Sequence, residues 1–285
     1  MTTPEPAPPN PTDPPNPTNS TSPAIAETAG TTEITAHTIL PALREDIELK
    51  TADGLTLVGE LALPPAGRPP VATLVTLHPL PTHAGMMDSH VYRKAAWRLP
   101  ALADLAVLRF NTRGTTSARG TSEGHFGEAV DERHDVAAAI DFVDARGLPN
   151  PWLVGWSFGT ELALKYGCEP QIRGAILLSP PLHRANEADI QTWAASGKPV
   201  RVLVPEFDDY LRPDQARERF AALLTPEAKA QGSALIPVAG AKHLWVGEKY
   251  VRTVLDEIVR TVNPSAAPLP TTYDARYGPA EKYTA

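Results

Sequence analysis

The stretch Pro151-Trp152-Leu153-Val154-Gly155-Trp156-Ser157-Phe158-Gly159-Thr160 decides the fold, because a short apolar run leads into Gly-x-Ser-x-Gly and then into helix-forming residues. A serine at the tip of a strand-to-helix turn needs a strained backbone, so the positions two before and two after it must be nearly free of side chains. Gly155 and Gly159 meet that need. The turn also places Ser157 at a helix N-terminus, where free N–H groups favour a developing negative charge. We therefore predict that Ser157 is a nucleophile; the alternative is a structural turn whose hydroxyl caps the helix.

A second Gly-x-Ser-x-Gly match, residues 120–124, lacks this context. It follows a polar run at 115–119 rather than a strand, and His125-Phe126-Gly127 comes next, where a helix would have to begin. We therefore expect Ser122 to lie in a loop.

The composition of the 285-residue chain changes at both ends. Residues 1–42 begin with a stretch rich in Pro, Thr, Asn and Ser that has too little apolar surface to offset chain entropy, and we predict a disordered tail. Residues 263–285 have a similar make-up apart from three tyrosines, and we predict a flexible Pro-rich tail. The remaining residues, 43–262, are enough for one well-buried domain.

Charge and cysteine content exclude several classes of protein. The net charge of −7 and the lack of a basic stripe argue against a nucleic-acid partner. The start of the chain shows neither a secretory signal nor an apolar run, so we expect a cytoplasmic protein without a membrane partner. The single Cys168 agrees with a reducing compartment. The histidine spacing includes no metal-binding motif, so we expect no metal and no cofactor. The sequence does not indicate an oligomeric state.

The order of apolar runs predicts the fold class. Five mostly continuous runs are typical of strands covered on both faces, and helical patterns lie between them. Residues 47–50 and 55–61 alternate in polarity around a tight turn, which predicts an antiparallel hairpin at the start. This order predicts an α/β fold with a mostly parallel sheet of about eight strands and helices on both faces. The expected strands are 71–77, 105–110, 152–154, 175–178, 200–204 and 233–238, and the expected helices are 90–99, 128–145, 158–168, 213–224 and 248–262.

Sheets of this kind bind ligands outside the carboxyl ends of their strands. The segments that follow the strands include His78-Pro79, Ser157, the acidic run 206–209, and His243. A serine, a late acid and a last histidine therefore come in that order along the chain.

With these segments the sequence resembles the α/β-hydrolase family, in particular small, lid-poor serine hydrolases similar to dienelactone hydrolase and prolyl-oligopeptidase-type domains. The likeness spans about residues 46–262 and depends on five motifs. The resemblance implies an α/β-hydrolase fold with a minimal cap, in which Ser157 is the nucleophile and His243 the base. The motifs are GWSFG, HPLPTHAG, RFNTRG, FDDYLRPDQ and AGAKHLW.

The acid of this implied triad has two candidates. Members of the family tend to place it four residues before a proline that starts the next helix, which selects Asp209 relative to Pro213. Asp208 is the alternative. This sequence departs from the family at Glu206, where a glycine commonly opens the acid loop. The resemblance also implies an oxyanion hole made by the backbone N–H groups of Phe158 and Leu80.

The implied activity is that of a serine hydrolase that cleaves a small carboxylic ester or thioester through an acyl-enzyme. An acyltransferase or peptidase using the same triad, and a non-catalytic binding protein of the same fold, are the alternatives. Only residues 180–198 lie where many such hydrolases insert a lid, enough for one short helix near 187–195. We therefore expect a shallow pocket for a small acyl substrate. Its expected apolar walls are Trp156, Phe158, Leu182 and Trp193.

Two further titratable or charged side chains, His78 and Arg113, lie near the expected site. His78 is expected to shape the oxyanion loop rather than to transfer protons. For Arg113 we expect a structural ion pair with a loop carboxylate such as Glu123 or Glu128; binding of a substrate carboxylate is the alternative.

Overall fold

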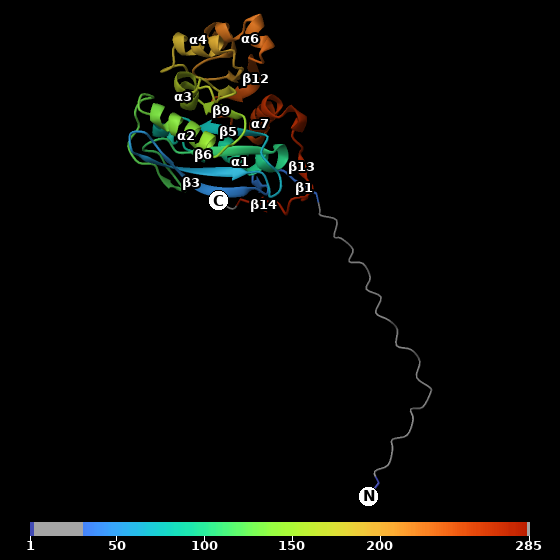
Figure 1. Cartoon of the computed structure of the whole chain (residues 1–285). Coiled ribbons are helices and arrows are strands. Elements are labelled where there is room, and N and C mark those ends of the chain that lie inside the picture. Colours follow the sequence, from blue (N-terminus) through green and yellow to red (C-terminus); the bar gives the residue numbers. More distant parts are fainter. Residues whose placement is uncertain (3–30, 284–285) are drawn as a thin grey trace.

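An eight-stranded sheet forms the centre of the computed structural model, which describes residues 1–2 and 31–283 (Figure 1). The strand order is β12-β11-β10-β9-β5-β6-β4-β3, and all neighbours pair in parallel except β3 with β4 and β4 with β6. The predicted α/β class and the antiparallel hairpin at the start are therefore confirmed. The strands are β3 (Leu43–Lys50), β4 (Thr56–Leu63), β5 (Ala72–Leu77), β6 (Leu105–Phe110), β9 (Pro151–Trp156), β10 (Gly174–Leu178), β11 (Val200–Phe207) and β12 (Ala234–Lys242).

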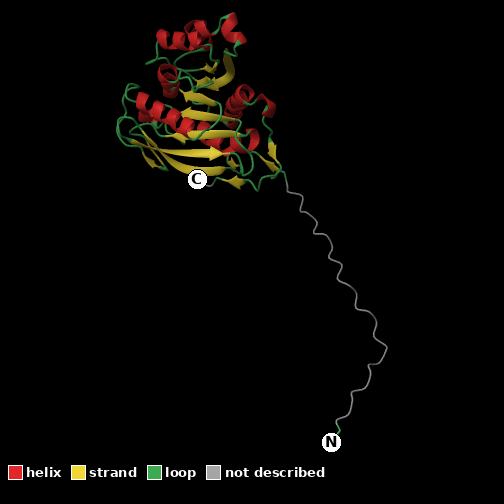
Figure 2. Ribbon diagram, viewed as in Figure 1, coloured by secondary structure: helices red, strands yellow, loops and turns green. Residues whose placement is uncertain are grey.

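Helices cover both faces of this sheet (Figure 2). Because successive side chains of a strand point to opposite faces, Ile176 and Leu177 of β10 enter two different cores. One core packs against α1 (His90–Ala103) and α7 (Glu248–Val262), and the other against α2 (Arg133–Ala145), α3 (Phe158–Tyr166) and α4 (Glu187–Ser196). The shorter helices are η1 (Pro81–His83), α5 (Pro213–Arg219), η2 (Ala221–Leu223), α6 (Pro226–Ala230) and η3 (Pro264–Ala266), and a small hairpin joins β7 (Thr116–Ser117) to β8 (Gly120–Thr121).

Of the five predicted helices only 248–262 has the observed bounds; α1 extends to Ala103 and α3 ends at Tyr166, and two others differ more. The α2 helix begins at Arg133 and not at residue 128, because Glu128 and Ala129 have φ values of 56° and 63°, which a right-handed helix cannot accommodate. The pattern at 213–224 forms two short helices, α5 and η2, because Phe220 between them leaves the helical conformation. These two larger differences arise from one or two backbone positions each.

The predicted domain boundaries need correction at both ends. Residues 263–283 do not form a separate tail: β13 (Thr272–Tyr273) pairs with β1 (Thr32–Glu33), and β14 (Glu281–Lys282) pairs with β2 (Thr38–Ile39). Leu40 and Tyr273, which are both buried, pack together on the C-terminal part of α1. The domain therefore includes residues 31–42 and 263–283, whereas the predicted tail from residue 3 to 30 lies outside the described residues.

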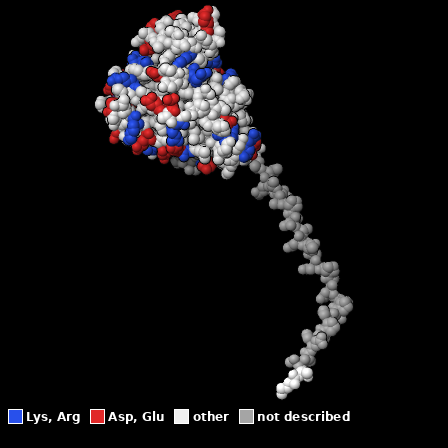
Figure 3. Space-filling view, viewed as in Figure 1, with Lys and Arg blue, Asp and Glu red and all other residues white. Residues whose placement is uncertain are grey.

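The visible surface carries mixed charge. Figure 3 shows lysine and arginine interspersed with aspartate and glutamate over the face that it displays. In the part of the chain that the structure describes, every helix is too short or too polar to cross a lipid bilayer.

Candidate active site

Ser157 occupies the turn between β9 and α3. Its backbone has φ 52° and ψ −115°, a strained conformation for a residue with a side chain, and its N–H donates to the carbonyl of Leu178 at 2.9 Å. The two glycines of the motif allow the close packing around this turn. A Cβ atom at Gly155 would lie 2.5 Å from the carbonyl oxygen of Gly159, and one at Gly159 would lie 1.8 Å from that of Leu77.

We expect Gly159→Ala to lower the free energy of unfolding by about 3 kcal/mol or more, because the new methyl group would overlap a strand carbonyl that cannot move freely. Urea denaturation measures this loss. Gly147→Ala is the control, because a Cβ atom there meets nothing within 4 Å. This variant should lose only about 1 kcal/mol, the cost of holding an alanine in the left-handed conformation at φ 61°. Equal losses in the two variants would contradict the close approach.

A line of hydrogen bonds connects Ser157 to a histidine and an aspartate. Nε2 of His243 lies 2.9 Å from Oγ of Ser157, and Nδ1 lies 2.9 Å from Oδ2 of Asp208. All three side chains are nearly buried, with 9 %, 6 % and 2 % of the surface of Ser157, His243 and Asp208 exposed. Because a carboxylate only accepts hydrogen bonds, Nδ1 carries the proton and Nε2 is left to accept from the serine hydroxyl.

The acid in this line is Asp208, so the assignment of Asp209 is corrected. The register between β11 and β12 shifts between Pro205 and Phe207, and the chain then turns, with the N–H of Asp208 bonded to the carbonyl of Pro205. This turn directs Asp208 toward His243 and leaves Asp209 exposed to solvent. The proline-based alignment cannot detect such a shift.

Local hydrogen bonds keep Asp208 ionised. Burial by itself would raise the pKa of this carboxyl, but the hydrogen bond and charge of His243 outweigh it. The backbone N–H groups of Tyr210 and Leu211 also donate to Oδ1, at 2.9 and 3.2 Å. The pKa of Asp208 is therefore below its ordinary value, and the group stays a carboxylate that can orient the imidazole.

Further contacts fix the position of His243. Its carbonyl oxygen accepts from the indole N–H of Trp156 at 3.2 Å and from the hydroxyl of Ser179 at 3.1 Å. The ring of Tyr210 meets the imidazole edge-on, with 4.7 Å between ring centres. Glu206, which departs from the family pattern, accepts the N–H of Gly240 at 2.7 Å and so joins the two loops. The sequence does not indicate the role of Tyr210. For Ser179 the only indication is that it directly follows a predicted strand.

The two expected oxyanion donors each lie at the start of a helix. Phe158 is the first residue of α3, and Leu80 immediately precedes η1. Within the described residues, neither backbone N–H donates a hydrogen bond to another protein group. Both N–H groups are therefore free of protein acceptors, which an oxyanion donor requires.

His78 holds the loop that contains Leu80. Its buried ring accepts the N–H of Thr112 at Nε2, at 3.0 Å, and donates from Nδ1 to the carbonyl of Pro79, at 2.7 Å. Burial lowers its pKa to about 4, because the imidazolium would be cut off from water. His78 is thus a neutral crosslink between the loops after β5 and β6, in agreement with the shaping role expected from the sequence.

This buried histidine makes stability depend on pH. Because its pKa is about 4 in the folded protein and 6.5 in the unfolded chain, the unfolded state binds more protons between these values, and stability falls as pH falls. Between pH 7 and pH 5 we expect His78 to account for a loss of about 2 kcal/mol. Urea titrations at the two pH values measure it. His78→Gln, which keeps an acceptor for Thr112, should lose correspondingly less, and an unchanged pH dependence would contradict the assignment.

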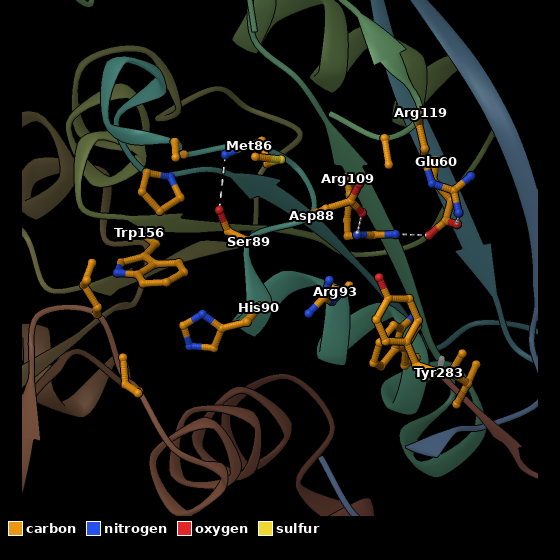
Figure 4. A pocket seen from close by; sticks show the side chains of 18 of the residues that line it. Glu60, Met86, Asp88, Ser89, His90, Arg93, Arg109, Arg119, Trp156 and Tyr283 are labelled. Carbon is orange, nitrogen blue, oxygen red and sulfur yellow. Dashed lines mark hydrogen bonds and ion pairs between the residues drawn. The ribbon is translucent and has the colours of Figure 1, made fainter. Parts of the chain in front are cut away.

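A cavity of about 830 Å³ opens next to Trp156, the residue before Ser157 (Figure 4). Trp156, Pro79 and Leu244 line it, and each is the chain neighbour of a site residue. Trp156 is therefore a wall, as predicted, but the other three predicted walls do not line this cavity. Phe158 packs against Phe126, Leu182 is buried in the same core, and Trp193 is fully buried and donates to carbonyl oxygens of α3.

Two polar side chains outside the triad have structural roles. Arg113 forms ion pairs with Asp53 and the buried Asp135, at 2.9 and 2.8 Å, and not with the expected Glu123 or Glu128. Ser122 lies in a loop, as predicted. Its buried hydroxyl accepts the N–H of Val58 and donates to the carbonyl of Asn111, at 2.9 and 2.8 Å. Among residues 1–2 and 31–283, no three His, Cys, Asp or Glu side chains are grouped so that they could hold a metal ion.

Comparison with known proteins agrees with this architecture. Residues 74–280 match the model of the alpha/beta hydrolase family. The fold is similar to a serine hydrolase without a lid from Xanthomonas campestris, with 24 % identity, a TM-score of 0.64, and coverage of 81 % of this chain and 99 % of that one. It is also similar to a serine hydrolase homologue from Coxiella burnetii, with 22 % identity, a TM-score of 0.60, and coverage of 76 % of this chain and 96 % of that one. An esterase from Pyrococcus furiosus is similar as well, with 16 % identity, a TM-score of 0.58, and coverage of 78 % of this chain and 94 % of that one. No curated protein sequence matches this chain.

The family match covers more than half of the chain, so the protein belongs to the alpha/beta hydrolase family. Within this family it has a small cap. The segment between β10 and β11 holds only α4, whose Ile190 and Trp193 pack into the core rather than over Ser157.

Proposed function

We propose that this protein is a serine hydrolase that cleaves a small carboxylic ester or thioester through an acyl-enzyme. The observation that carries the proposal is the continuous hydrogen-bond line from Ser157 through His243 to Asp208. A serine hydroxyl is a poor nucleophile unless a base removes its proton during attack, and a neutral imidazole within hydrogen-bond distance is suited to that task.

In the first half of the reaction, Oγ of Ser157 attacks the substrate carbonyl carbon while Nε2 of His243 takes the hydroxyl proton. Asp208 stabilises the imidazolium that results. The N–H groups of Phe158 and Leu80 would bind the oxyanion, and one such donor is worth about 3 kcal/mol in the transition state. The tetrahedral intermediate then breaks its bond to the leaving group, which takes the proton from His243 and departs as an alcohol or thiol.

In the second half of the reaction, water enters the site from which the alcohol or thiol has departed. His243 removes one proton from the water as its oxygen attacks the acyl carbon, and a second tetrahedral intermediate forms. Its collapse breaks the bond to Oγ of Ser157, which regains a proton from His243. The products are a carboxylic acid and the original enzyme.

The small cap supports a small and accessible substrate. In the described residues α4 is the only helix between β10 and β11, and its apolar side chains face the core. The exposed side chains of Leu244 and Val246 lie at the cavity instead. A site of this kind gives little enclosed apolar surface for a long acyl chain.

A fluorophosphonate probe tests the proposal, because it phosphonylates only a serine that is activated in this way. We expect one adduct, located at Ser157 by peptide mass spectrometry, and none in Ser157→Ala. An unlabelled wild-type protein, or labelling that persists in Ser157→Ala, would contradict the proposal. A panel of short esters, thioesters and amides, with product analysis in the presence of alcohols, then separates hydrolase, acyltransferase and peptidase activities.

A further inference from the structure

The cavity beside Trp156 contains an arginine that has no acidic partner. Arg93 projects from the first turns of α1, and Figure 4 shows it between His90 and Tyr283. Within the described residues its guanidinium forms no ion pair and no hydrogen bond, and its Nε, like that of Arg109, is buried without a partner. The unpartnered Nε costs free energy, and a ligand in the cavity could supply acceptors for the guanidinium.

The other arginines of the cavity differ from Arg93 because each has an acidic partner; Arg44 lies 3.7 Å from Glu60. Arg109 pairs with Glu60 at 2.5 Å and with Asp88 at 2.7 Å, and Arg119 pairs with Glu60 and Asp46. Four arginines line the cavity against three carboxylates, so the lining carries an excess of positive charge. The unpaired member of this set is Arg93.

Two aromatic rings hold Arg93 in place. Its guanidinium carbon lies 5.1 Å from the ring centre of Trp97 and 5.0 Å from that of Tyr283. Such cation–π contacts fix the guanidinium plane but use none of its N–H donors. Tyr283 reaches this position because β14 pairs with β2 and its own N–H donates to the carbonyl of His37 at 2.8 Å. The C-terminal segment therefore builds part of the cavity wall.

The cavity extends from Arg93 to Trp156 and Leu244, the chain neighbours of Ser157 and His243. His90 meets the ring of Trp156 edge-on, at 5.3 Å, and Trp156 precedes Ser157 in the chain. Trp156 also donates to the carbonyl of His243. A substrate that is attacked at Ser157 can thus place another part along Trp156 and His90, with its end at Arg93.

We propose that Arg93 is a specificity-determining residue and that the preferred substrates carry a carboxylate, bound by Arg93 in this cavity. The inference rests on the proposed hydrolase function and adds the chemical class of its substrate. A planar guanidinium suits a carboxylate because two parallel N–H···O bonds can form. The walls near Ser157 are apolar and the far end is cationic, so the substrate is an ester with an anionic end.

Binding to the inactive Ser157→Ala variant tests the proposal without relying on turnover. The probes are two series of esters of increasing chain length, one with a terminal carboxylate on the acyl part and one with it on the alcohol part. Each ester is matched by the corresponding carboxamide. We expect Kd to be about 10- to 100-fold lower for the carboxylate in one series, the range of a charged hydrogen-bonded pair.

Adding Arg93→Gln to this variant should abolish the preference and leave Kd for the carboxamide unchanged, whereas adding Arg133→Gln, an arginine on α2 outside the cavity, should preserve it. Tyr283→Leu should reduce the preference by about 2- to 10-fold and Tyr283→Phe should keep it. No preference in either series, or one that survives Arg93→Gln, overturns the proposal. If the wild-type protein is not labelled by the fluorophosphonate at Ser157, the hydrolase function is overturned instead. The binding result with the Ser157→Ala variant remains interpretable in that case.

Discussion

Replacing Ser157 by alanine is expected to lower kcat for a small activated ester by about 10⁴- to 10⁶-fold, because the variant loses the atom that forms the covalent intermediate. KM should change little, since the cavity beside Trp156 and the backbone donors stay in place. Initial rates over a range of substrate concentration measure both constants. Far-ultraviolet circular dichroism and the melting temperature verify that the variant is folded.

Ser122→Ala provides a matched control, because Ser122 is the centre of the other Gly-x-Ser-x-Gly segment. Its hydroxyl bonds to the backbone of β4 and of the loop after β6, so its loss should reduce stability by about 1 kcal/mol and leave kcat within about 3-fold. If Ser157→Ala kept most of the activity, or if Ser122→Ala lost as much, the nucleophile would lie elsewhere.

Asp208→Asn is expected to lower kcat by about 10⁴-fold, the size of effect seen when an amide replaces the acid of a serine triad. The amide can still lie against Nδ1, but its nitrogen favours the tautomer in which Nε2 carries the proton and cannot accept one from Ser157. Steady-state kinetics with the same ester measure the loss.

Asp209→Asn is the natural comparison, because it makes the same chemical change one residue away. Asp209 is exposed, so we expect kcat to stay within about 3-fold of the wild-type value. Equal losses in the two variants would mean that the loop after β11 adopts another conformation in solution, with both carboxylates near His243.

The fold and two of the three residues in the Ser157–His243–Asp208 hydrogen-bond line could be predicted because local pattern determines them. Continuous apolar runs separated by helical periods specify a doubly covered sheet, and Gly155 and Gly159 flank Ser157 because the turn permits no larger residue. His243 follows the last strand, so its position depends on strand order alone. These signals depend on residues that are neighbours in the sequence, so they can be recognised without the tertiary structure.

The acid could not be predicted in the same way. Which of two adjacent aspartates faces His243 depends on the number of residues between the end of β11 and the turn, and the register shift near Pro205 changes that number. The polarity pattern of the sequence does not reveal this register shift, because Asp208 and Asp209 both carry a carboxylate. A single irregular pairing in the sheet thus decided between Asp208 and Asp209.

The C-terminal segment and the cavity wall were missed for a different reason. Leu269 and Tyr273 are buried, but they are single apolar residues within a Pro-rich stretch and follow neither a helical nor a strand period. Tyr273 packs with Leu40 and Ala101, and Leu269 lies in the core beside α1 and α7, so most of their partners are far away in the sequence. Arg93 likewise looks like an ordinary surface residue of an amphipathic helix until Tyr283 is placed beside it.

The pairing of β1 with β13 and of β2 with β14 also determines how this protein can be handled in the laboratory. A chain cut after Val262, the boundary that its composition favours, would expose two unpaired strand edges and the apolar ring face of Trp97, and such surfaces promote aggregation. A purification tag attached behind Tyr283 would begin beside the cavity that Tyr283 lines. Tags are therefore better attached to the N-terminal end.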